Sequence, residues 1–404
     1  MRWKLICLLS YIANSFDIPK SLIGRTFIQN GPRPNRKSIL YGLGEITSVH
    51  FKSKDEVVVS NEIIPKNNNF FRHILTDVPD SILTKIISMF VLGSGEKMNT
   101  CNTAIASIED NLYEVEETSN PFKIEIDKNG FLQMIGFIHN MTMAAHQPKN
   151  NEYFSYLPHR SAPLFIMGNQ VNWFPKYRPA MIHDAKKIND KKYLFPISAL
   201  RIGNILSWLF KNTTFPLKAE GNFSWFVHDI VTKENTVIST DLPSTNVFHI
   251  AECIQKGRNV LEVWAAISCS ERVEEWINND IDALSEQNHI CKFIIDINKK
   301  TCKTRIYKTQ IEFAKIDHNP AFLIGLKDEN TIVRFNKITK SSKEYKFKER
   351  INELCIVDDG QHYIYLKSDD NVRESSVVLS DRKFNELYSV EVPYREHAFH
   401  SFLT

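Results

Sequence analysis

Four of the thirteen histidines in the chain have neighbourhoods that could support chemistry. They are His146 in MTMAAHQPK, His183 in PAMIHDAKK, His249 in STNVFHIAECI and His400 in HAFHSFLT, and each has apolar or aromatic neighbours. Neutral imidazole is a ligand for divalent iron, zinc and copper. A single histidine in such a setting is more often a hydrogen-bonded core residue, and the separations fit neither HExxH, CxxC nor an EF-hand. By themselves the four residues indicate a metal site only weakly.

Composition excludes several classes of protein. The chain has 404 residues, of which 43% are hydrophobic and 24% charged, so it is neither disordered nor fibrous. The 50 basic and 47 acidic residues leave a net charge of +3 without a basic block, so we expect no nucleic-acid partner. Seven dispersed cysteines without a CxxC pair argue against a disulfide framework. They favour a reducing compartment, and we expect a cytoplasmic protein.

The first 17 residues, MRWKLICLLSYIANSFD, combine a basic start with a short apolar run. This segment 1–17 could be signal-like or an interfacial anchor. Because the run is short and no clean A-x-A site follows, we favour a buried or interfacial segment. No apolar stretch reaches the ~18 residues that span a bilayer. We expect one folded domain over residues 18–404, either soluble or peripheral on a membrane surface.

Strand signals dominate the rest of the chain. Short segments rich in β-branched and aromatic residues are bounded by clusters of Asn, Asp, Gly or Lys. These predicted strands are residues 56–64, 103–108, 192–198, 235–240, 259–268, 291–297, 331–335, 362–366 and 375–381. Many short strands with polar turns favour an all-β sandwich pair or propeller. The absence of Pro-rich or Ser-rich linkers favours one continuous domain.

Two segments, residues 80–93 and 198–212, have apolar residues at helical spacing with Lys or Arg beside them. Each could be a helix that caps the core. Each could also be an interfacial patch that places apolar side chains in a bilayer while its basic groups meet the head groups. Composition leaves both interpretations open. The candidate bilayer-facing residues are Ile86, Ile87, Phe90, Leu206, Trp208, Leu209 and Phe210.

A series of motifs extends from about residue 18 to the C-terminus. The chain opens with IPKSLIGRTFIQNGPRP, close to the pattern I-P-x-x-L-x-G-x-x-x-R-N-G-P, with Gln29 where Arg is usual. CNTAIASI follows, and then MAAHQPK, IHDAKKINDKKYLF, VFHIAECIQ and FHS match T-A-H-P, H-D-F, F-H-x-x-N-x-x-E and F-H-G in order. Together these motifs resemble the carotenoid cleavage oxygenases, the family of the retinal-pigment-epithelium isomerase and the lignostilbene dioxygenases.

The resemblance implies an all-β fold, namely a seven-bladed β-propeller with a loop and helix cap over its top face. One histidine from each of four blades would hold Fe(II) on the axis, so the implied ligands are His146, His183, His249 and His400. The last strand would close the ring and deliver His400 to the axis. His397 is a rival for this role, but it lacks the F-H context.

The family also places three glutamates beside the ligand histidines, where a carboxylate accepts a hydrogen bond from an imidazole N–H and orients the ring. Glu117 in EETSNP and Glu312 in IEFAKID match two of these places, with Ala314 instead of the usual proline. A solvated strand carboxylate is the alternative for both. For Glu117 the register is blurred by Glu114 and Glu116.

The third glutamate of the family belongs to E-D-D-G, which is matched by IVDDG with Val357 at the glutamate position. We therefore expect this carboxylate to be lost, so that Asp358 replaces it or one histidine has no carboxylate partner. Such a loss typically costs ~10–100-fold in metal affinity or activity. The family's aromatic-D-G-D-G turn is reduced to LYGLGEITSVHF. The chain is thus expected to be a divergent member.

The resemblance implies a non-haem Fe(II)-dependent dioxygenase that cleaves a conjugated carbon–carbon double bond. Its partners would be dioxygen and a carotenoid, apocarotenoid or stilbene-like polyene, which yields carbonyl products. One alternative is an isomerohydrolase reaction on a retinyl ester at the same iron site. Another is a degenerate propeller that binds an apolar ligand without catalysis. Because carotenoids reside in membranes, segments 80–93 and 198–212 would lie at a tunnel mouth on the bilayer, which favours the interfacial interpretation.

Overall fold

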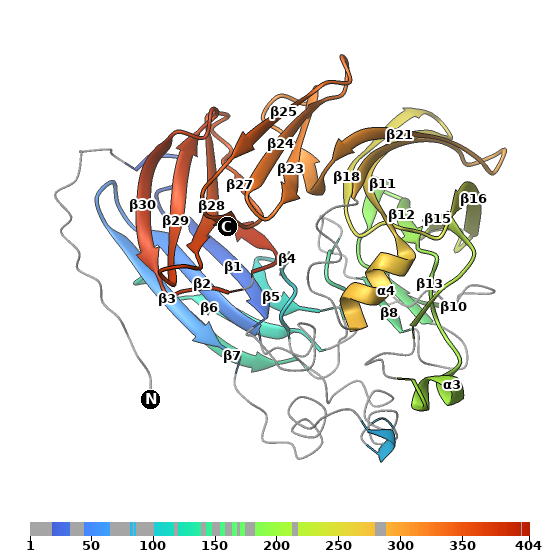
Figure 1. Ribbon diagram of the computed structural model, residues 1–404, viewed down its shortest axis with the longest axis horizontal. Coiled ribbons are helices and arrows are strands. Elements are labelled where there is room, and N and C mark those ends of the chain that lie inside the picture. The colour runs from blue at the N-terminus through green and yellow to red at the C-terminus, as the bar shows by residue number, and fades with distance from the viewer. Residues whose placement is uncertain are drawn as a thin grey trace.

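Seven antiparallel sheets surround a common centre in the computed structural model of the chain and form the blades of a β-propeller (Figure 1). The expected all-β class and seven-bladed architecture are thereby confirmed. The structure describes residues 18–32, 44–64, 81–83, 85, 101–116, 120–138, 143–147, 154–157, 164–167, 170–173, 182–211, 217–278, 288–396 and 398–404. Segment 1–17 lies outside these residues.

The first three blades come from the N-terminal part of the chain, and one of them includes the last strand. Blade one has the order β3–β2–β1–β31, with β1 (Thr26–Pro32), β2 (Gly44–Phe51), β3 (Val57–Ile63) and β31 (Ser401–Leu403). Blade two is the meander β4 (Ala104–Ile108), β5 (Asn111–Val115), β6 (Phe122–Ile126) and β7 (Leu132–Phe137). Blade three contains β8 (Phe154–Leu157), β9 (Leu164–Met167) and β10 (Gln170–Trp173).

The middle blades carry the additions that lie outside the ring. Blade four contains β11 (Lys186–Asn189), β12 (Lys192–Ile197), β15 (Asn222–Asp229) and β16 (Asn235–Pro243). Between β12 and β15 the chain forms the ribbon of β13 (Leu200–Ile202) and β14 (Leu217–Ala219), with helix α3 (Ile205–Leu209). Blade five contains β17 (Thr245–Asn246), β18 (Ile250–Gly257), β19 (Val260–Cys269), β20 (His289–Asp296) and β21 (Thr301–Gln310), with helix α4 (Ser270–Asn278) after β19.

The last two blades are built from consecutive strands. Blade six contains β22 (Glu312–Ile316), β23 (Phe322–Asp328), β24 (Thr331–Asn336) and β25 (Ser342–Lys346). Blade seven contains β26 (Arg350–Ile351), β27 (Cys355–Ile356), β28 (His362–Asp369), β29 (Glu374–Asp381) and β30 (Glu386–Val392). Every predicted strand segment therefore overlaps an observed strand.

The hydrophobic core lies between adjacent blades. Side chains alternate between the two faces of a strand, so Leu261, Val263 and Ala265 of β19 share one face, and all three are buried. Trp225 of blade four and Phe293 of blade five meet in this core edge to face, with ring centroids 5.0 Å apart. Burying a large apolar side chain stabilises the fold by roughly 1.5–3 kcal/mol. Each blade is therefore held chiefly by its neighbours in the ring.

Pairing of the first and last strands closes the ring. In blade one, Phe27, Ile28 and Gln29 of β1 lie opposite Leu403, Phe402 and Ser401 of β31. The inner edge strands also contact one another from blade to blade: β11 with β18, β18 with β22, β27 with β31, and β31 with β4. The last residues of the chain therefore lie at the centre of the propeller, as expected.

The segment 198–212 is helical over only five of its residues. The expectation of a longer helix is wrong at its start, because Leu200–Ile202 pairs with Leu217–Ala219 as the β13–β14 ribbon. Helix α4 packs against this ribbon and buries Leu200, Phe248 and Val273 in one cluster. Of segment 80–93 the structure describes residues 81–83 and 85. Within the described part of the chain no helix is long and apolar enough to cross a membrane.

A bulge in β22 changes the direction of its side chains. The register against β23 shifts between Glu312 and Lys315, and Phe313 has a φ of 51°, a left-handed conformation that is rare for a bulky residue. Gly325 lies on the neighbouring strand, where a Cβ atom would overlap the backbone oxygen of Glu312 and lie 2.9 Å from Cγ1 of Ile311. The bulge therefore requires a glycine at position 325.

Arg395 and Glu114 are two buried titratable side chains that interact electrostatically. Arg395 donates hydrogen bonds to the backbone oxygens of Glu45 (2.5 Å) and Gly31 (3.3 Å). Among the described residues Glu114 has no hydrogen-bond partner for either carboxylate oxygen. Burial raises the pKa of Glu114 well above its ordinary value, although the charge of Arg395 opposes the shift. Burial also lowers the pKa of Arg395, to about 10.

We predict that Gly325→Ala lowers the free energy of unfolding by about 1–3 kcal/mol, because the new methyl group must displace the β22 bulge. Gly257→Ala is the matched control, since a Cβ atom at Gly257 of β18 meets nothing within 4 Å. Urea denaturation followed by tryptophan fluorescence measures both variants. Equal losses of stability in the two would contradict the steric argument.

We predict that Glu114→Gln stabilises the protein in a pH-dependent way. Because the pKa of Glu114 is raised in the folded state, its favourable contribution is complete below the unfolded pKa and is lost as pH rises through the folded pKa. The substitution should change the free energy of unfolding little near pH 4. At pH 8 it should raise that free energy by about 1–3 kcal/mol. Glu125→Gln, at an exposed position of the same blade, should show no such difference between urea titrations at the two pH values.

Candidate metal centre

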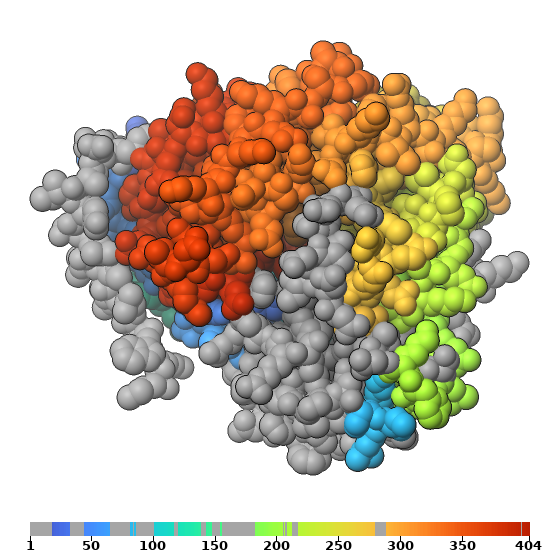
Figure 2. All heavy atoms as spheres, viewed as in Figure 1, coloured from blue at the N-terminus to red at the C-terminus, as the bar shows by residue number. Residues whose placement is uncertain are grey.

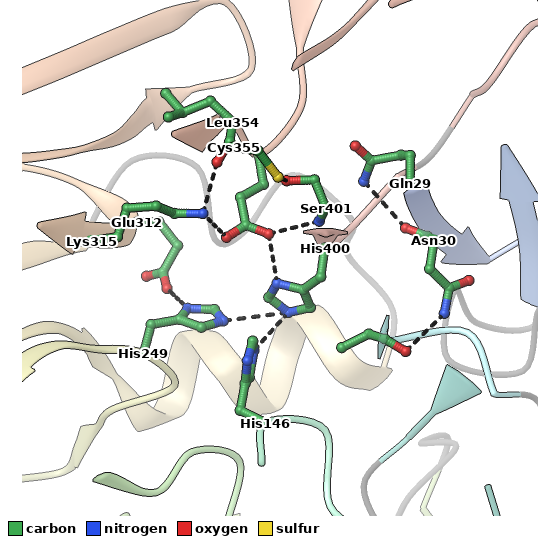
Figure 3. A network of polar contacts seen from close by, with 12 residues as sticks. Gln29, Asn30, His146, His249, Glu312, Lys315, Leu354, Cys355, His400 and Ser401 are labelled. Atoms are coloured by element: carbon green, nitrogen blue, oxygen red, sulfur yellow. Dashed lines mark hydrogen bonds and ion pairs between the residues drawn. The ribbon is translucent and has the colours of Figure 1, made fainter. Parts of the chain in front are cut away.

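The structure brings together the four histidines that the sequence singled out. One ligand atom from each of His146, His183, His249 and His400 lies within 4.8 Å of the others. The Nε2 atoms converge, with separations of 3.1 Å for His146 and His400, 3.3 Å for His183 and His249, and 3.4 Å for His249 and His400. Figure 3 shows three of these rings meeting at one point. Residues up to 254 positions apart in sequence thus form one cluster.

Each histidine comes just before or ahead of a strand of a different blade: blades three, four, five and one. His249 directly precedes β18 and His400 directly precedes β31, while His183 lies three residues before β11 and His146 lies ahead of β8. Backbone hydrogen bonds hold these approaches: the amide of His146 donates to the carbonyl of His183 at 3.1 Å, and that of Asn30 to the carbonyl of His400 at 3.0 Å. The histidines that precede these inner strands therefore point toward the axis of the propeller.

Two of the rings are oriented by glutamates. Nδ1 of His249 donates to Oε1 of Glu312, and Nδ1 of His400 donates to Oε2 of Glu353 at 3.0 Å (Figure 3). The same Oε2 atom accepts the amide of Ser401 at 2.9 Å. A neutral imidazole that donates from Nδ1 carries its lone pair on Nε2. Both glutamates thus direct a ligand lone pair into the centre.

Burial favours the neutral form of two of the histidines, and the two glutamates beside the cluster differ in pKa. Burial, reinforced by the neighbouring histidines, lowers the pKa of His146 and of His249 well below the ordinary value. Burial raises the pKa of Glu312 to about 7. Burial would also raise the pKa of Glu353, but the charges of Lys315 and His400 outweigh it and hold this pKa far below the ordinary value.

The donor set fits a divalent transition metal. Two ligand atoms at right angles, each about 2.1 Å from a first-row metal ion, lie about 3 Å apart. The observed Nε2 separations of 3.1–3.4 Å are close to this value. Lone pairs facing one another at that distance repel unless a cation lies among them, and imidazole is a preferred ligand of iron, zinc and copper. The four-histidine cluster could therefore bind a metal ion.

The expected loss of the third carboxylate is wrong. Val357 is fully buried in the apolar cluster of Phe27 and Leu366, and Asp358 is an exposed partner of Arg25. The carboxylate comes from Glu353, four residues earlier, in the turn that leads into β27. Matching on the Asp-Asp-Gly turn placed the residue too late in the sequence. A glutamate followed by the apolar run LCIV was the signal that could have found it.

The structure describes only one of the remaining three candidates, Glu312, Glu117 and His397. Glu312 accepts from His249, as a carboxylate partner should. Glu117 and His397 lie outside the described residues. Next to Glu117, the Glu116 carboxylate accepts the backbone amide of Cys101 at 3.0 Å and so serves the local turn.

Asp184 is a residue of the site that the sequence reasoning missed. It follows His183 directly, is 2% exposed, and accepts the backbone amide of Ile250 at 2.8 Å. Ile250 in turn follows His249, so this carboxylate ties two histidine-bearing segments from adjacent blades together. Lys186 balances its charge at 3.2 Å. Asp184 is part of the motif IHDAKK, but its partner Ile250 is 66 residues away in the sequence, so no local pattern indicated the contact.

The candidate bilayer-facing residues divide into four groups. Leu206 and Phe210 are 70% and 78% exposed, beside the exposed Ile82 and Leu83, and Figure 2 shows segment 81–85 next to α3. Trp208 is 3% exposed, so its assignment to an exposed surface is wrong. Lys85 covers it, since Nζ lies 5.2 Å from the Trp208 ring centroid and 3.2 Å from its carbonyl oxygen. Leu209 is half-buried, and Ile86, Ile87 and Phe90 lie outside the described residues.

The solved structures that resemble this chain include forms of one apocarotenoid oxygenase and a chimera made from it. The cobalt-substituted Synechocystis apocarotenoid oxygenase has a TM-score of 0.74 and 16% identity, covering 96% of this chain and 94% of that chain. A glutamate-to-glutamine variant of the same enzyme has a TM-score of 0.73 and 15% identity, with the same coverage. A chimera of apocarotenoid oxygenase and the retinal pigment epithelial membrane protein has a TM-score of 0.73 and 16% identity, covering 96% and 93%.

Sequence comparison agrees with the fold. No curated protein sequence matches the chain significantly. The family model described as "retinal pigment epithelial membrane protein" matches residues 15–395, which is nearly the whole chain. Together with the propeller and its convergent histidines, this match supports the resemblance that the motifs indicated. The chain belongs to the retinal pigment epithelial membrane protein family.

Proposed function

We propose that the protein is a non-haem Fe(II)-dependent dioxygenase that cleaves a conjugated carbon–carbon double bond of a carotenoid, apocarotenoid or stilbene-like substrate to carbonyl products. The observation that carries this proposal is the convergence of four imidazole Nε2 atoms in a member of this family. An oxygenase of the same fold, the apocarotenoid oxygenase, adds support. The reaction class is thus taken from the family, and the ligand set from the geometry.

In this proposal His146, His183, His249 and His400 are the iron ligands. Four neutral imidazoles leave coordination positions open, and bound Fe(II) would supply the redox chemistry that dioxygen requires. Glu312 and Glu353 hold the Nδ1 protons of His249 and His400, which fixes the tautomer of each ring. We assign the same role to Glu117 on the basis of its motif.

Aromatic side chains beside the cluster suit an apolar substrate. The Phe313 ring lies 4.8 Å from His249 and 5.1 Å from His400, and the Phe248 ring lies 5.1 Å from His183, between ring centroids. Such walls exclude water and present no hydrogen-bonding groups to a polyene. The chain's own contribution is therefore to hold the ligands and to offer an apolar surface next to them.

We predict about one iron per chain in the purified protein, and oxygen-dependent cleavage of an apocarotenoid or stilbene to aldehyde or ketone. His400→Ala should weaken metal binding by about 100-fold or more, because it removes a ligand itself. His362→Ala is the matched control, since His362 also pairs through Nδ1 with a carboxylate, Asp359 at 2.7 Å, outside the cluster. Elemental analysis and chromatography of the products measure both.

Two outcomes would contradict different parts of this proposal. Wild-type protein that retains neither iron nor cobalt would overturn the metal centre. Stoichiometric iron with conversion of a retinyl ester to an isomerised alcohol, and no cleavage of any polyene, would overturn the cleavage reaction and leave the metal centre standing.

We further propose that the exposed apolar patch of Ile82, Leu83, Leu206 and Phe210 rests on a membrane surface, from which an apolar substrate is taken. These side chains are 49–78% exposed, although burial of such residues is strongly favoured. Lys85 and Lys211 lie at its base, where the Lys85 ammonium group contacts the backbone oxygen of Lys211. Lys85 is 5% exposed, so the exposed Lys211 is the cation that borders this apolar surface.

We predict that Leu206→Asp combined with Phe210→Asp reduces liposome binding at least tenfold, because each side chain contributes roughly 1.5–3 kcal/mol on burial and 1.4 kcal/mol is tenfold. Flotation with liposomes of phosphatidylcholine and phosphatidylserine measures the bound fraction. The control is Ile338→Asp combined with Val372→Asp, two residues 75% and 59% exposed on other blades. If both double variants bind as the wild type does, the patch has no such role.

A further inference from the structure

The two glutamates that orient histidines differ in their own partners. Glu353 forms an ion pair with Lys315, whose Nζ lies 2.5 Å from Oε1, while Oε2 accepts from His400. Lys315 Nζ also donates to the carbonyl oxygen of Leu354 at 2.7 Å. Within the part of the chain that the structure describes, Glu312 has no lysine or arginine in an ion pair. Of the two glutamates that orient histidines, only Glu353 therefore has a cationic side chain in an ion pair among the described residues.

The contacts from Lys315 to His400 cross three successive blades. Lys315 belongs to β22 of blade six, Glu353 lies between β26 and β27 of blade seven, and His400 precedes β31 of blade one. Figure 3 shows Lys315 on one side of this network and His400 and Ser401 on the other. Because Glu353 also accepts the amide of Ser401, the ion pair reaches both the ring of His400 and the backbone of the closing strand.

The β22 bulge makes this arrangement possible. In a regular strand, residues three apart point to opposite faces. The shift in register between Glu312 and Lys315 instead lets both side chains point toward the centre. One strand therefore supplies the carboxylate for His249 and the ammonium group that supports the carboxylate of His400. The left-handed conformation of Phe313 therefore contributes to the arrangement of the site as well as to the fold.

We propose that Lys315 is a positioning residue of the metal centre, which acts on His400 by holding Glu353. This inference rests on the proposed four-histidine metal site. A buried carboxylate is costly unless it is paired, and Glu353 is 8% exposed. Without the lysine, Glu353 loses the partner of Oε1 and is free to turn toward solvent. The His400 ring then loses its fixed orientation, and a metal ion binds less tightly with an altered ligand geometry.

The experiment is a titration of metal-free protein with Co(II), whose visible absorption reports ligand geometry as well as occupancy. Lys315→Met removes the charge and keeps the length of the side chain, and Lys315→Gln is a second variant that keeps a donor. Lys315→Arg is the conservative rescue. The matched control is Lys327→Met, because Lys327 is on β23 of the same blade, is similarly exposed, and pairs with Glu344 at 3.0 Å away from the histidines.

We expect Lys315→Met and Lys315→Gln to weaken Co(II) binding about tenfold and to shift the Co(II) bands. Lys315→Arg should stay within about threefold of the wild type, and Lys327→Met should match it. Wild-type affinity and spectrum in Lys315→Met or Lys315→Gln would overturn the inference while the proposed function stands. An equal effect of Lys327→Met would overturn it too, because general stability or net charge would then be the cause. A wild-type protein that binds no Co(II) would overturn the proposed metal centre itself.

Discussion

The candidate site depends on closure of the propeller ring, in which the first strand pairs with the last. Pairing of β31 with β1 places His400 on the axis, and the same pairing fixes the blades that carry His146, His183 and His249. Four imidazole nitrogens do not gather at 3.1–3.4 Å by mutual attraction, since their lone pairs repel. The packing of large apolar side chains between blades stabilises the fold and offsets the unfavourable free energy of this repulsion. A rigid scaffold therefore holds an arrangement that the side chains alone would not adopt.

Electrostatics then distinguishes ligands that are chemically identical. Burial lowers the pKa of His146 and His249, which favours the neutral form that binds metal. The carboxylates that accept from His249 and His400 have different surroundings. Among the described residues Glu312 has no lysine or arginine in an ion pair, whereas Glu353 lies between His400 and Lys315. A neutral ligand set leaves the charge of a divalent ion to be balanced by such carboxylates. The partners that fix each carboxylate should therefore affect how rigidly the histidine ring bonded to it is oriented.

The divergence of the chain from its relatives is tolerated because the site is defined by positions on the ring. With 15–16% identity, the solved structures share the fold over nearly the whole chain. The histidines lie ahead of the inner strands of their blades. A strand can change most of its residues and still deliver one side chain to the axis, provided that its alternation of buried and exposed faces is kept.

Local patterns in the sequence predicted nine of the strands, because alternation of apolar residues depends only on near neighbours. They also singled out the four histidines, although only the family resemblance joined them into one site. The tertiary structure decided the features that depend on distant partners. Glu353 supports His400 because β27 and β31 meet, and Trp208 is buried because Lys85 covers it. Lys315 turns inward because Gly325, on another strand, leaves room for a bulge. None of these contacts is encoded within one short segment.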